Sequence, residues 1–338
     1  MFRVTTNGSL RMYKSNLMQT TNGLNNAMTK LMTQRNFNSY ATDPAAATRA
    51  FKIHSSLNAT NVQASNNESV LKKYETAWKV VDLVRNDLTT EMGQVPALEG
   101  LNDAGKSELN SQGQILRNGA EAMIQSMNSQ YNNEFLFGGL ETEEVPFEIR
   151  DGEVYYRGIA VDSNDPKLDE MNNEHQYVDI GLGFKKDNAG NIIDSTAFDA
   201  SLSGIEITGY GTDADGDPKN LASIMLRLAD IFEGYNEETG AWTVGSEEEA
   251  NRLVNKFNAA RDAMTEQHSS MTAEAKFLET NGTQLNETFD SLNAERSNIE
   301  DIDTVDAILE LSWAQTCYNA ALQVGTSVIP QSLIDYLR

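Results

Sequence analysis

The stretch most typical of catalysis is Gly100-Leu-Asn-Asp-Ala-Gly105-Lys106-Ser107, which matches the phosphate-loop pattern G-x-x-x-x-G-K-[ST]. Such a loop binds phosphate when a buried strand enters it and a helix leaves it, because its backbone N–H groups must converge on the phosphate oxygens. Residues 89–96 instead continue a helical pattern, and no alternation of strands and helices follows. A P-loop nucleotide-binding enzyme is therefore a remote alternative for this chain.

Three closely spaced carboxylates, Asp213, Asp215 and Asp217, are of the type that binds a hard cation such as Ca²⁺. A calcium loop of the EF-hand type needs a glycine after the third acidic position and a glutamate six residues later. Here Pro218 and Lys219 follow instead. We therefore expect a solvated acidic turn and no metal site.

The remaining residues that could bind a metal or act as nucleophiles are isolated. His54, His175 and His268 are far apart in the sequence, and the single cysteine, Cys317, lies within a helical pattern. One thiol can form neither a disulfide framework nor a thiolate metal cage, and no G-x-S-x-G elbow is present. We expect no catalytic residues, no cofactor and no bound metal.

Composition narrows the class of protein further. The 338 residues are 39% hydrophobic, enough for two or three domains with buried cores. A net charge of −24 repels phosphate backbones, which argues against nucleic acid as a partner. No apolar run approaches the roughly 18 residues of a membrane span, and the N-terminus lacks the pattern of a cleaved signal peptide. We expect no membrane insertion.

The charge is distributed unevenly along the chain. Residues 1–42 contain five basic residues and no acidic ones, whereas residues 300–338 contain six acidic residues and one basic residue. Because complementary charges steer association and set register, we expect the two ends to pair, within one molecule or between molecules. An acid-free stretch rich in Ser, Thr and Asn also resembles an organelle transit peptide, but this one carries an ordered leucine repeat.

That repeat predicts a first amphipathic helix, because its leucines fall seven residues apart: Leu10, Leu17, Leu24 and Leu31. Asn22 and Gly23 weaken the helix, so it needs a partner. Asp43-Pro44 marks a break, because proline restricts the residue before it and suits a first helical turn. Apolar residues at three- and four-residue steps then predict helices over 53–95 and 109–131, the latter closing near Asn133.

After Gly138-Gly139 the apolar period falls towards two, which predicts strands. Asp151-Gly152 suits the tight turn of a hairpin between residues 147–150 and 153–156. The alternating Val178, Ile180, Leu182 and Phe184 indicate a further strand. We expect a small antiparallel β domain inserted into a helical protein.

The longest regular feature is a predicted helix of some fifty residues ending near Ile299. Apolar residues occupy one heptad position seven times in succession: Phe257, Met264, Met271, Leu278, Leu285, Leu292 and Ile299. The other heptad position becomes polar at Gln267, Glu274 and Asn281, which suits a broad bundle better than a two-stranded zipper. A last helix follows Asp303, until Pro330 ends it. The fold class is therefore mainly α, with a long helical rod and a terminal coiled-coil bundle.

Both ends of the chain and the border of the insertion together resemble the bacterial flagellar axial proteins, the flagellin-like family. The resemblance covers about residues 1–150 and 220–338, and the residues that carry it are Asp43-Pro44-Ala45-Ala46-Ala47, Asn133-Glu134-Phe135-Leu136-Phe137-Gly138-Gly139, and the stretch from Asp301-Ile302-Asp303 to Ser332-Leu333-Ile334-Asp335-Tyr336-Leu337. The Gly-Gly border and the Asp-Pro segment favour the subunit at the hook–filament junction. A filament flagellin is the alternative within the same family.

The resemblance implies three domains. Residues 1–45 and 300–338 would form an inner coiled coil that is disordered in the free monomer. Residues 46–140 and 218–299 would form a helical rod, and residues 141–217 an outward-facing β domain. It also implies export by the flagellar type III apparatus without a cleaved signal peptide, and an extracellular place in the flagellum. The implied partners are further copies in a homo-oligomeric ring, hook-associated protein 1, flagellin and an export chaperone that holds the C-terminal helix.

We therefore expect a structural adapter, and no enzyme, that joins hook to filament by packing of its terminal helices. Hiding the apolar seams needs neighbouring subunits, and burying each leucine contributes about 1.5–3 kcal/mol. The predicted assembly interface consists of Leu10, Leu17, Leu24, Leu31, Ile308, Leu311, Leu322, Val328, Leu333 and Leu337.

Overall fold

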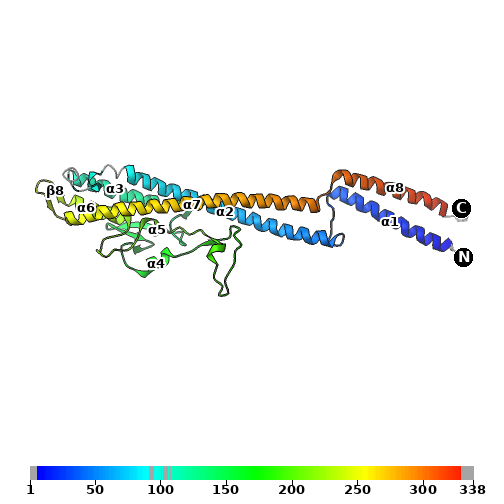
Figure 1. Cartoon of the computed structure of the whole chain (residues 1–338), viewed down its shortest axis with the longest axis horizontal. Coiled ribbons are helices and arrows are strands. Elements are labelled where there is room, and N and C mark those ends of the chain that lie inside the picture. Colours follow the sequence, from blue (N-terminus) through cyan, green and yellow to red (C-terminus); the bar gives the residue numbers. More distant parts are fainter. Residues whose placement is uncertain (1–5, 91–94, 100, 102–105, 107, 329–338) are drawn as a thin grey trace. The chain divides into compact units, whose positions relative to one another are not determined.

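The computed structural model describes residues 6–90, 95–99, 101, 106 and 108–328 (Figure 1). The chain is mainly helical, with small antiparallel sheets in its middle, which confirms the predicted fold class. It divides into two compact units, which we name the terminal unit (Met1–Asn61 and Asn286–Arg338) and the central unit (Val62–Leu285). The division into three domains stays a prediction.

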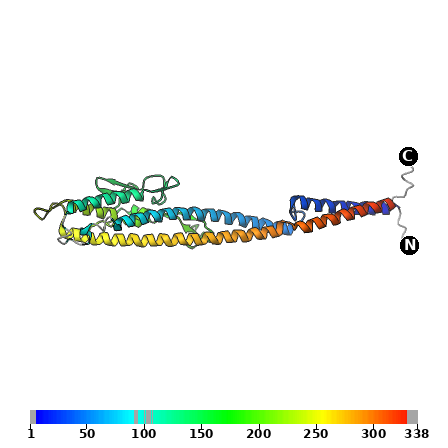
Figure 2. The same cartoon turned by 90° about the horizontal axis from the view of Figure 1, so that it is seen from above.

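The terminal unit is built around two helices from opposite ends of the chain, α1 (Thr6–Thr33) and α8 (Thr304–Val328). They lie side by side and antiparallel, as Figures 1 and 2 show in two orthogonal views. Lys30 near the end of α1 forms a 3.1 Å ion pair with Glu310 near the start of α8. The two oppositely charged ends therefore pair within one molecule.

Two of the helices in the terminal unit begin at an aspartate. The Asp43 carboxylate accepts backbone N–H groups of Ala45 and Ala46 where α2 (Pro44–Thr90) starts. Asp303 does the same for the first turn of α8. In each case the carboxylate satisfies N–H groups that have no partner inside the helix. Both predicted starts are confirmed.

The core of the central unit is formed by α2, α3 (Leu109–Met127), α6 (Leu221–Glu233) and α7 (Glu247–Glu300). Helix α6 packs against α3 and is buried around most of its circumference. On α7 the apolar heptad position is buried from Phe257 to Leu285, as predicted. The 3₁₀ turn η2 (Pro96–Leu98) follows α2 and also contributes to this core.

Helix α3 ends at Met127, so the prediction that it continues towards Asn133 is wrong. Asn128 exchanges two hydrogen bonds with the backbone of Phe147, which diverts the chain from the helical path. Strands β1 (Gln130–Tyr131) and β2 (Glu134–Phe135) then pair across a two-residue turn. Asn132 and Asn133 form that turn at φ 52° and 66°, values that asparagine tolerates better than most residues.

The predicted hairpin is present as β3 (Phe147–Arg150) and β4 (Glu153–Tyr156), and β5 (Ile159–Ala160) adds a third strand. Asp151 and Gly152, both at positive φ, supply its turn. The strand predicted over residues 178–184 is wrong in extent, because Gly181 and Gly183 also turn to positive φ and interrupt the extended chain. Only β6 (Tyr177–Val178) forms there, pairing with β7 (Phe198–Asp199).

The remaining elements are short. Helices α4 (Pro166–Asn172) and α5 (Gly204–Thr208) and the turn η3 (Asp194–Thr196) lie within the insertion. Strands β8 (Tyr235–Asn236) and β9 (Ala241–Trp242) form a hairpin between α6 and α7. Within the central unit the insertion lies along one side of α7 (Figure 1), and Asn281 of α7 donates a 2.8 Å hydrogen bond to the carbonyl of Ile180.

Candidate assembly interface

The face of α8 that is protected from solvent alternates four- and three-residue steps, as expected for a helix that packs on one partner. Its members are mostly small: Ala307, Leu311, Ala314, Tyr318, Ala321 and Gly325. The matching face of α1 contains Tyr13, Leu17, Leu24, Ala27 and Leu31. These two faces form the seam between α1 and α8.

Within the seam, Tyr13 of α1 packs against Gly325 of α8. A Cβ atom placed on Gly325 would overlap the hydroxyl and ring carbon atoms of Tyr13. Gly325 is buried, and a side chain at this position would require the Tyr13 ring to shift. This contact was not predicted from the sequence, although the seven-residue spacing of Tyr318 and Gly325 places both on one helix face.

The structure separates the predicted interface residues into groups. Four of them are half-buried in the seam: Leu17, Leu24, Leu31 and Leu311. Leu10, near the start of α1, is exposed. Ile308 and Leu322 are exposed beside the seam. The side chain of Val328, and both Leu333 and Leu337, lie outside the described part of the chain. Helix α1 therefore covers only part of the predicted interface.

A second apolar surface of α8 lies outside the seam, with Val305, Leu309 and Trp313 on the opposite side of the helix and Val324 on its flank. We call it the outer stripe; it consists of Val305, Leu309, Trp313 and Val324. All four side chains are more than half exposed, and Trp313 is 71% exposed. An exposed tryptophan is a common mark of a protein–protein contact. Sequence spacing alone could not say which side of α8 would be covered.

The terminal unit is closed at one end by a backbone clamp between the α1–α2 connection and the α7–α8 connection. Arg35 and Asp301 form an antiparallel bridge, and Asn36 N–H donates a 2.8 Å hydrogen bond to the carbonyl of Glu300. The side chain of Asn36 also donates to the carbonyl of Asp301 at 2.8 Å. Nearby, Nε2 of His54 lies 2.7 Å from a carboxylate oxygen of Glu300, which is almost fully buried.

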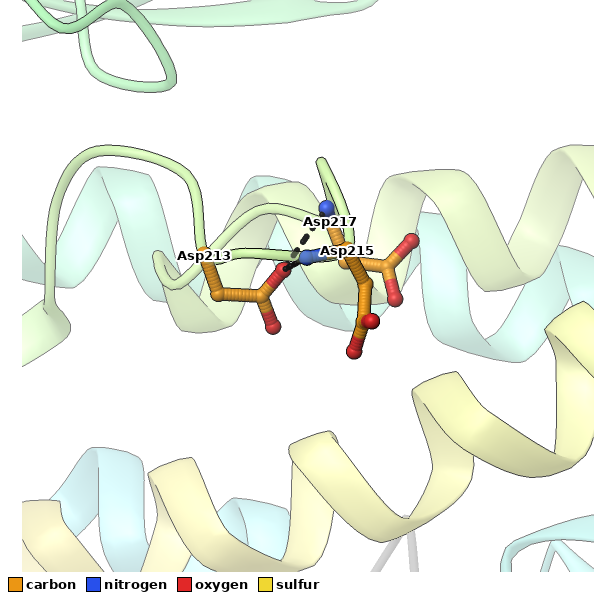
Figure 3. A group of neighbouring side chains, drawn as sticks. All are labelled: Asp213, Asp215 and Asp217. Atoms are coloured by element: carbon orange, nitrogen blue, oxygen red, sulfur yellow. Dashed lines mark hydrogen bonds between the residues drawn. The ribbon is translucent and has the colours of Figure 1, made fainter.

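The acidic turn predicted from Asp213, Asp215 and Asp217 is the one group of carboxylates close enough to hold a metal ion within the described residues. The carboxylate of Asp213 accepts the backbone N–H groups of Asp215 and Asp217, which folds the turn (Figure 3). The ammonium group of Lys256, on α7, lies 2.5 to 3.2 Å from all three carboxylates. A lysine therefore occupies the position that a cation would take.

Arg252, one turn away on α7, also binds Asp217. The hydrogen bonds from Arg252 and Lys256 lower the pKa of Asp217 to about 2. The turn is thus an ion-paired attachment of the insertion to α7 and is not simply solvated, which corrects the expectation. It shows no feature that requires a metal.

Within the described residues, the other candidate catalytic or ligand-binding side chains do not come together in one site. Most of the phosphate-loop match, including Gly100 and Gly105, lies outside the described residues, and Lys106 forms a 2.7 Å ion pair with Glu247. His175 pairs with Asp199, whereas His268 lies against the ring of Trp78. Cys317 is exposed on α8.

None of the helices in the described segments is both long and apolar enough to cross a membrane. The terminal unit presents two apolar surfaces, the seam between α1 and α8 and the outer stripe of α8. Each is an apolar surface suited to packing against another protein.

Residues 254–337 match the family model of the bacterial flagellin C-terminal helical region. Among solved structures, a Vibrio parahaemolyticus protein described as a flagellar hook-associated protein has a TM-score of 0.56 at 14% identity, covering 77% of this chain and 100% of its own. FlgL from Bacillus cereus is 16% identical with a TM-score of 0.47, and the match covers 73% of this chain and 99% of FlgL. Flagellar hook associated protein-3 from Legionella pneumophila is 12% identical with a TM-score of 0.49, and the match covers 73% of this chain and 98% of that protein. No curated protein sequence matches this chain.

Proposed function

We propose that this chain, which has the C-terminal helical region of flagellins and the fold of a flagellar hook-associated protein, is the structural subunit that joins hook to filament in the bacterial flagellum. The observation that carries the proposal is the terminal unit. It pairs both ends of the chain into one two-helix element, yet leaves the outer stripe uncovered. A two-helix element with a second apolar face is suited to packing against copies of itself.

We further propose that the subunits form a ring, with hook-associated protein 1 on one side and flagellin on the other. An export chaperone would cover the C-terminal helix before assembly, and the flagellar type III apparatus would carry the chain to the cell exterior. In the proposed domain arrangement, the inner coiled coil consists of residues 1–45 and 300–338, and the rod consists of residues 46–140 and 218–299. Residues 141–217 would face outwards.

The seam is tested by replacing Leu17 and Leu24 together with aspartate. Both are half-buried between α1 and α8, so the charges should separate these helices and abolish addition of the protein to isolated hooks, observed by electron microscopy. Asn16→Asp with Asn25→Asp is the matched control, because both residues are exposed on α1 and the added charge is the same. Junctions formed by the leucine variant would contradict the role of the seam.

The outer stripe is tested separately through Trp313. In a variant with Trp78 and Trp242 replaced by phenylalanine, so that Trp313 is the one remaining indole, we expect the emission to shift to shorter wavelength when the protein assembles on hooks, because a neighbouring subunit would remove the indole from water. Trp313→Ser should leave the thermal unfolding of the monomer unchanged and weaken assembly. Gln315→Ser, at another exposed position of α8, is the control. An emission maximum unchanged on assembly would mean that the stripe stays in water.

A filament flagellin is the second candidate, favoured by the match of residues 254–337 to the flagellin C-terminal region. The two functions differ in what the purified protein builds in precipitating salt. Long homopolymeric filaments would identify a flagellin. A short collar on hooks that carry hook-associated protein 1, followed by growth of added flagellin, would identify the junction subunit.

We also propose that the chain is not an enzyme. The lysine of the phosphate-loop match is engaged by Glu247, which competes with a phosphate for its charge. If the proposal is right, ATP will change neither the melting temperature nor the rate of phosphate release, because a ligand that binds the native state must stabilise it.

A further inference from the structure

The central unit contains a cavity of about 280 Å³ between α7 and the insertion. Glu274 reaches it from α7, Glu206 from α5, and Tyr74 from α2. The cavity is also lined by Asn172, at the end of α4, and by Ser203, just before α5. The assembly proposal uses none of these residues.

The wall offers hydrogen-bond acceptors that receive no donor from the described part of the protein. The carboxylates of Glu206 and Glu274 form no ion pair and accept no hydrogen bond there. The hydroxyl of Ser203, a residue 94% buried, and the fully enclosed Oδ1 atom of Asn172 are also without a partner. Buried polar atoms are nearly always satisfied, so the Ser203 hydroxyl and the Asn172 oxygen indicate a ligand that brings donors. The exposed Glu206 and the half-buried Glu274 add two carboxylates that line the same cavity.

The ligand must also bring positive charge, because the nearby cations are already engaged. Lys73 donates to the carbonyl of Ala200 at 2.7 Å, and His175 pairs with Asp199. Arg157 binds Glu174 on the same side of the insertion. Glu274 is half-buried, and burial together with the charges of Glu206 and Asp199 raises its pKa. A bound cation would relieve this repulsion.

The spacing of the carboxylates selects the kind of cation. Within the described residues, only the turn at Asp213, Asp215 and Asp217 brings three potential metal ligands within 4.8 Å of one another. The carboxylates of the cavity are therefore too far apart for three of them to close on one metal ion. They suit an elongated cation with several N–H donors.

We propose that this cavity binds a small organic cation carrying amine or guanidinium groups, held by Glu206 and Glu274 with Ser203 and Asn172 as further acceptors. The cavity is large enough for an arginine-sized molecule or a short polyamine. The same chemistry could be supplied by a free metabolite or by an arginine or lysine side chain of a neighbouring copy.

The test is a calorimetric titration of the full-length protein with agmatine and, separately, with spermidine. We expect saturable binding, weakened at least about tenfold by Glu274→Gln or Glu206→Gln, because each removes a charged acceptor. Glu266→Gln is the matched control, since it makes the same change at an exposed residue of α7 that does not line the cavity. It should bind as the wild type does.

Equal binding by all variants would indicate diffuse attraction to a chain of net charge −24 and would overturn the proposal. Absence of binding, or Ca²⁺ binding with the same dependence on Glu206 and Glu274, would overturn it as well. Sedimentation velocity then separates the two sources. If agmatine dissociates oligomers of the wild-type protein, and Glu274→Gln does so without agmatine, the cation is a side chain of another copy. If neither changes association, it is a free molecule.

Discussion

The backbone N–H of Asn36 donates a 2.8 Å hydrogen bond to the carbonyl oxygen of Glu300, the last residue of α7. This bond joins the connection that follows α1 to the connection that precedes α8. The side chain of Asn36 adds bonds to the carbonyls of Asp301 and Ile299, at 2.8 and 3.3 Å. The end of α1 and the start of α8 are therefore held together at one clamped point.

Asn36→Ala should remove the side-chain bonds of the clamp and keep the backbone bond. We expect the unfolding free energy of the terminal unit to fall by about 0.5–1 kcal/mol, at the low end for hydrogen bonds because these are exposed to water. Faster hydrogen exchange at the amide of Ile302, which donates to Gln34, would report the loosening locally. Asn38→Ala, an exposed neighbour, should leave that exchange rate unchanged.

Gly325→Ala should destabilise the pair of α1 and α8, because the new methyl group would overlap the Tyr13 ring. Gly23→Ala is its opposite: Gly23 lies within α1 with no heavy atom near its missing Cβ, so the change should stabilise the helix by about 0.5–1 kcal/mol. Thermal unfolding followed by circular dichroism distinguishes the two. An increase in stability for both variants would show that the ring does not lie on Gly325.

The ion pairs at Asp217 predict a loss of stability in acid. Because the folded-state pKa is near 2 and the ordinary value is 3.8, the stabilisation is complete above about pH 4 and is lost as the pH falls towards 2. We expect Asp217→Asn to cost on the order of 1–2 kcal/mol at pH 7 and much less at pH 2. Asp262→Asn, whose carboxylate is largely exposed on the same helix, is the control and should show little change.

Asp162 predicts the opposite dependence on pH. Burial raises its pKa to about 6, and its Oδ1 atom has no hydrogen-bond partner within the described residues. The charged carboxylate is therefore unfavourable in the folded state, and its contribution to stability decreases as the pH rises from about 4 through 6. Asp162→Asn should raise the melting temperature at pH 7.5 and leave it unchanged at pH 4. If the exposed control Asp87→Asn gave the same gain, the effect would reflect net charge and not burial.

Local patterns in the sequence predicted the elements that are determined by residues close together in the chain. Asp43 and Asp303 begin helices because a carboxylate next to a helix start satisfies its free N–H groups, and Asp151-Gly152 turns a hairpin because both residues accept positive φ. The apolar heptads of α7 identified its buried face for the same reason, since period and burial are linked in one helix. The prediction of a strand over residues 178–184 was wrong, because two glycines in it adopt positive φ and interrupt the extended backbone.

Contacts between distant residues required the tertiary structure. The polar heptad positions of α7 looked like a weak seam, yet they face the insertion: Asn281 bonds to Ile180, and Glu274 and Gln267 line the cavity. Periodicity tells which residues share a face but not what that face meets. For the same reason the sequence predicted pairing of the two chain ends, whereas only the fold placed Tyr13 on Gly325, Lys256 among three aspartates and Trp313 in water.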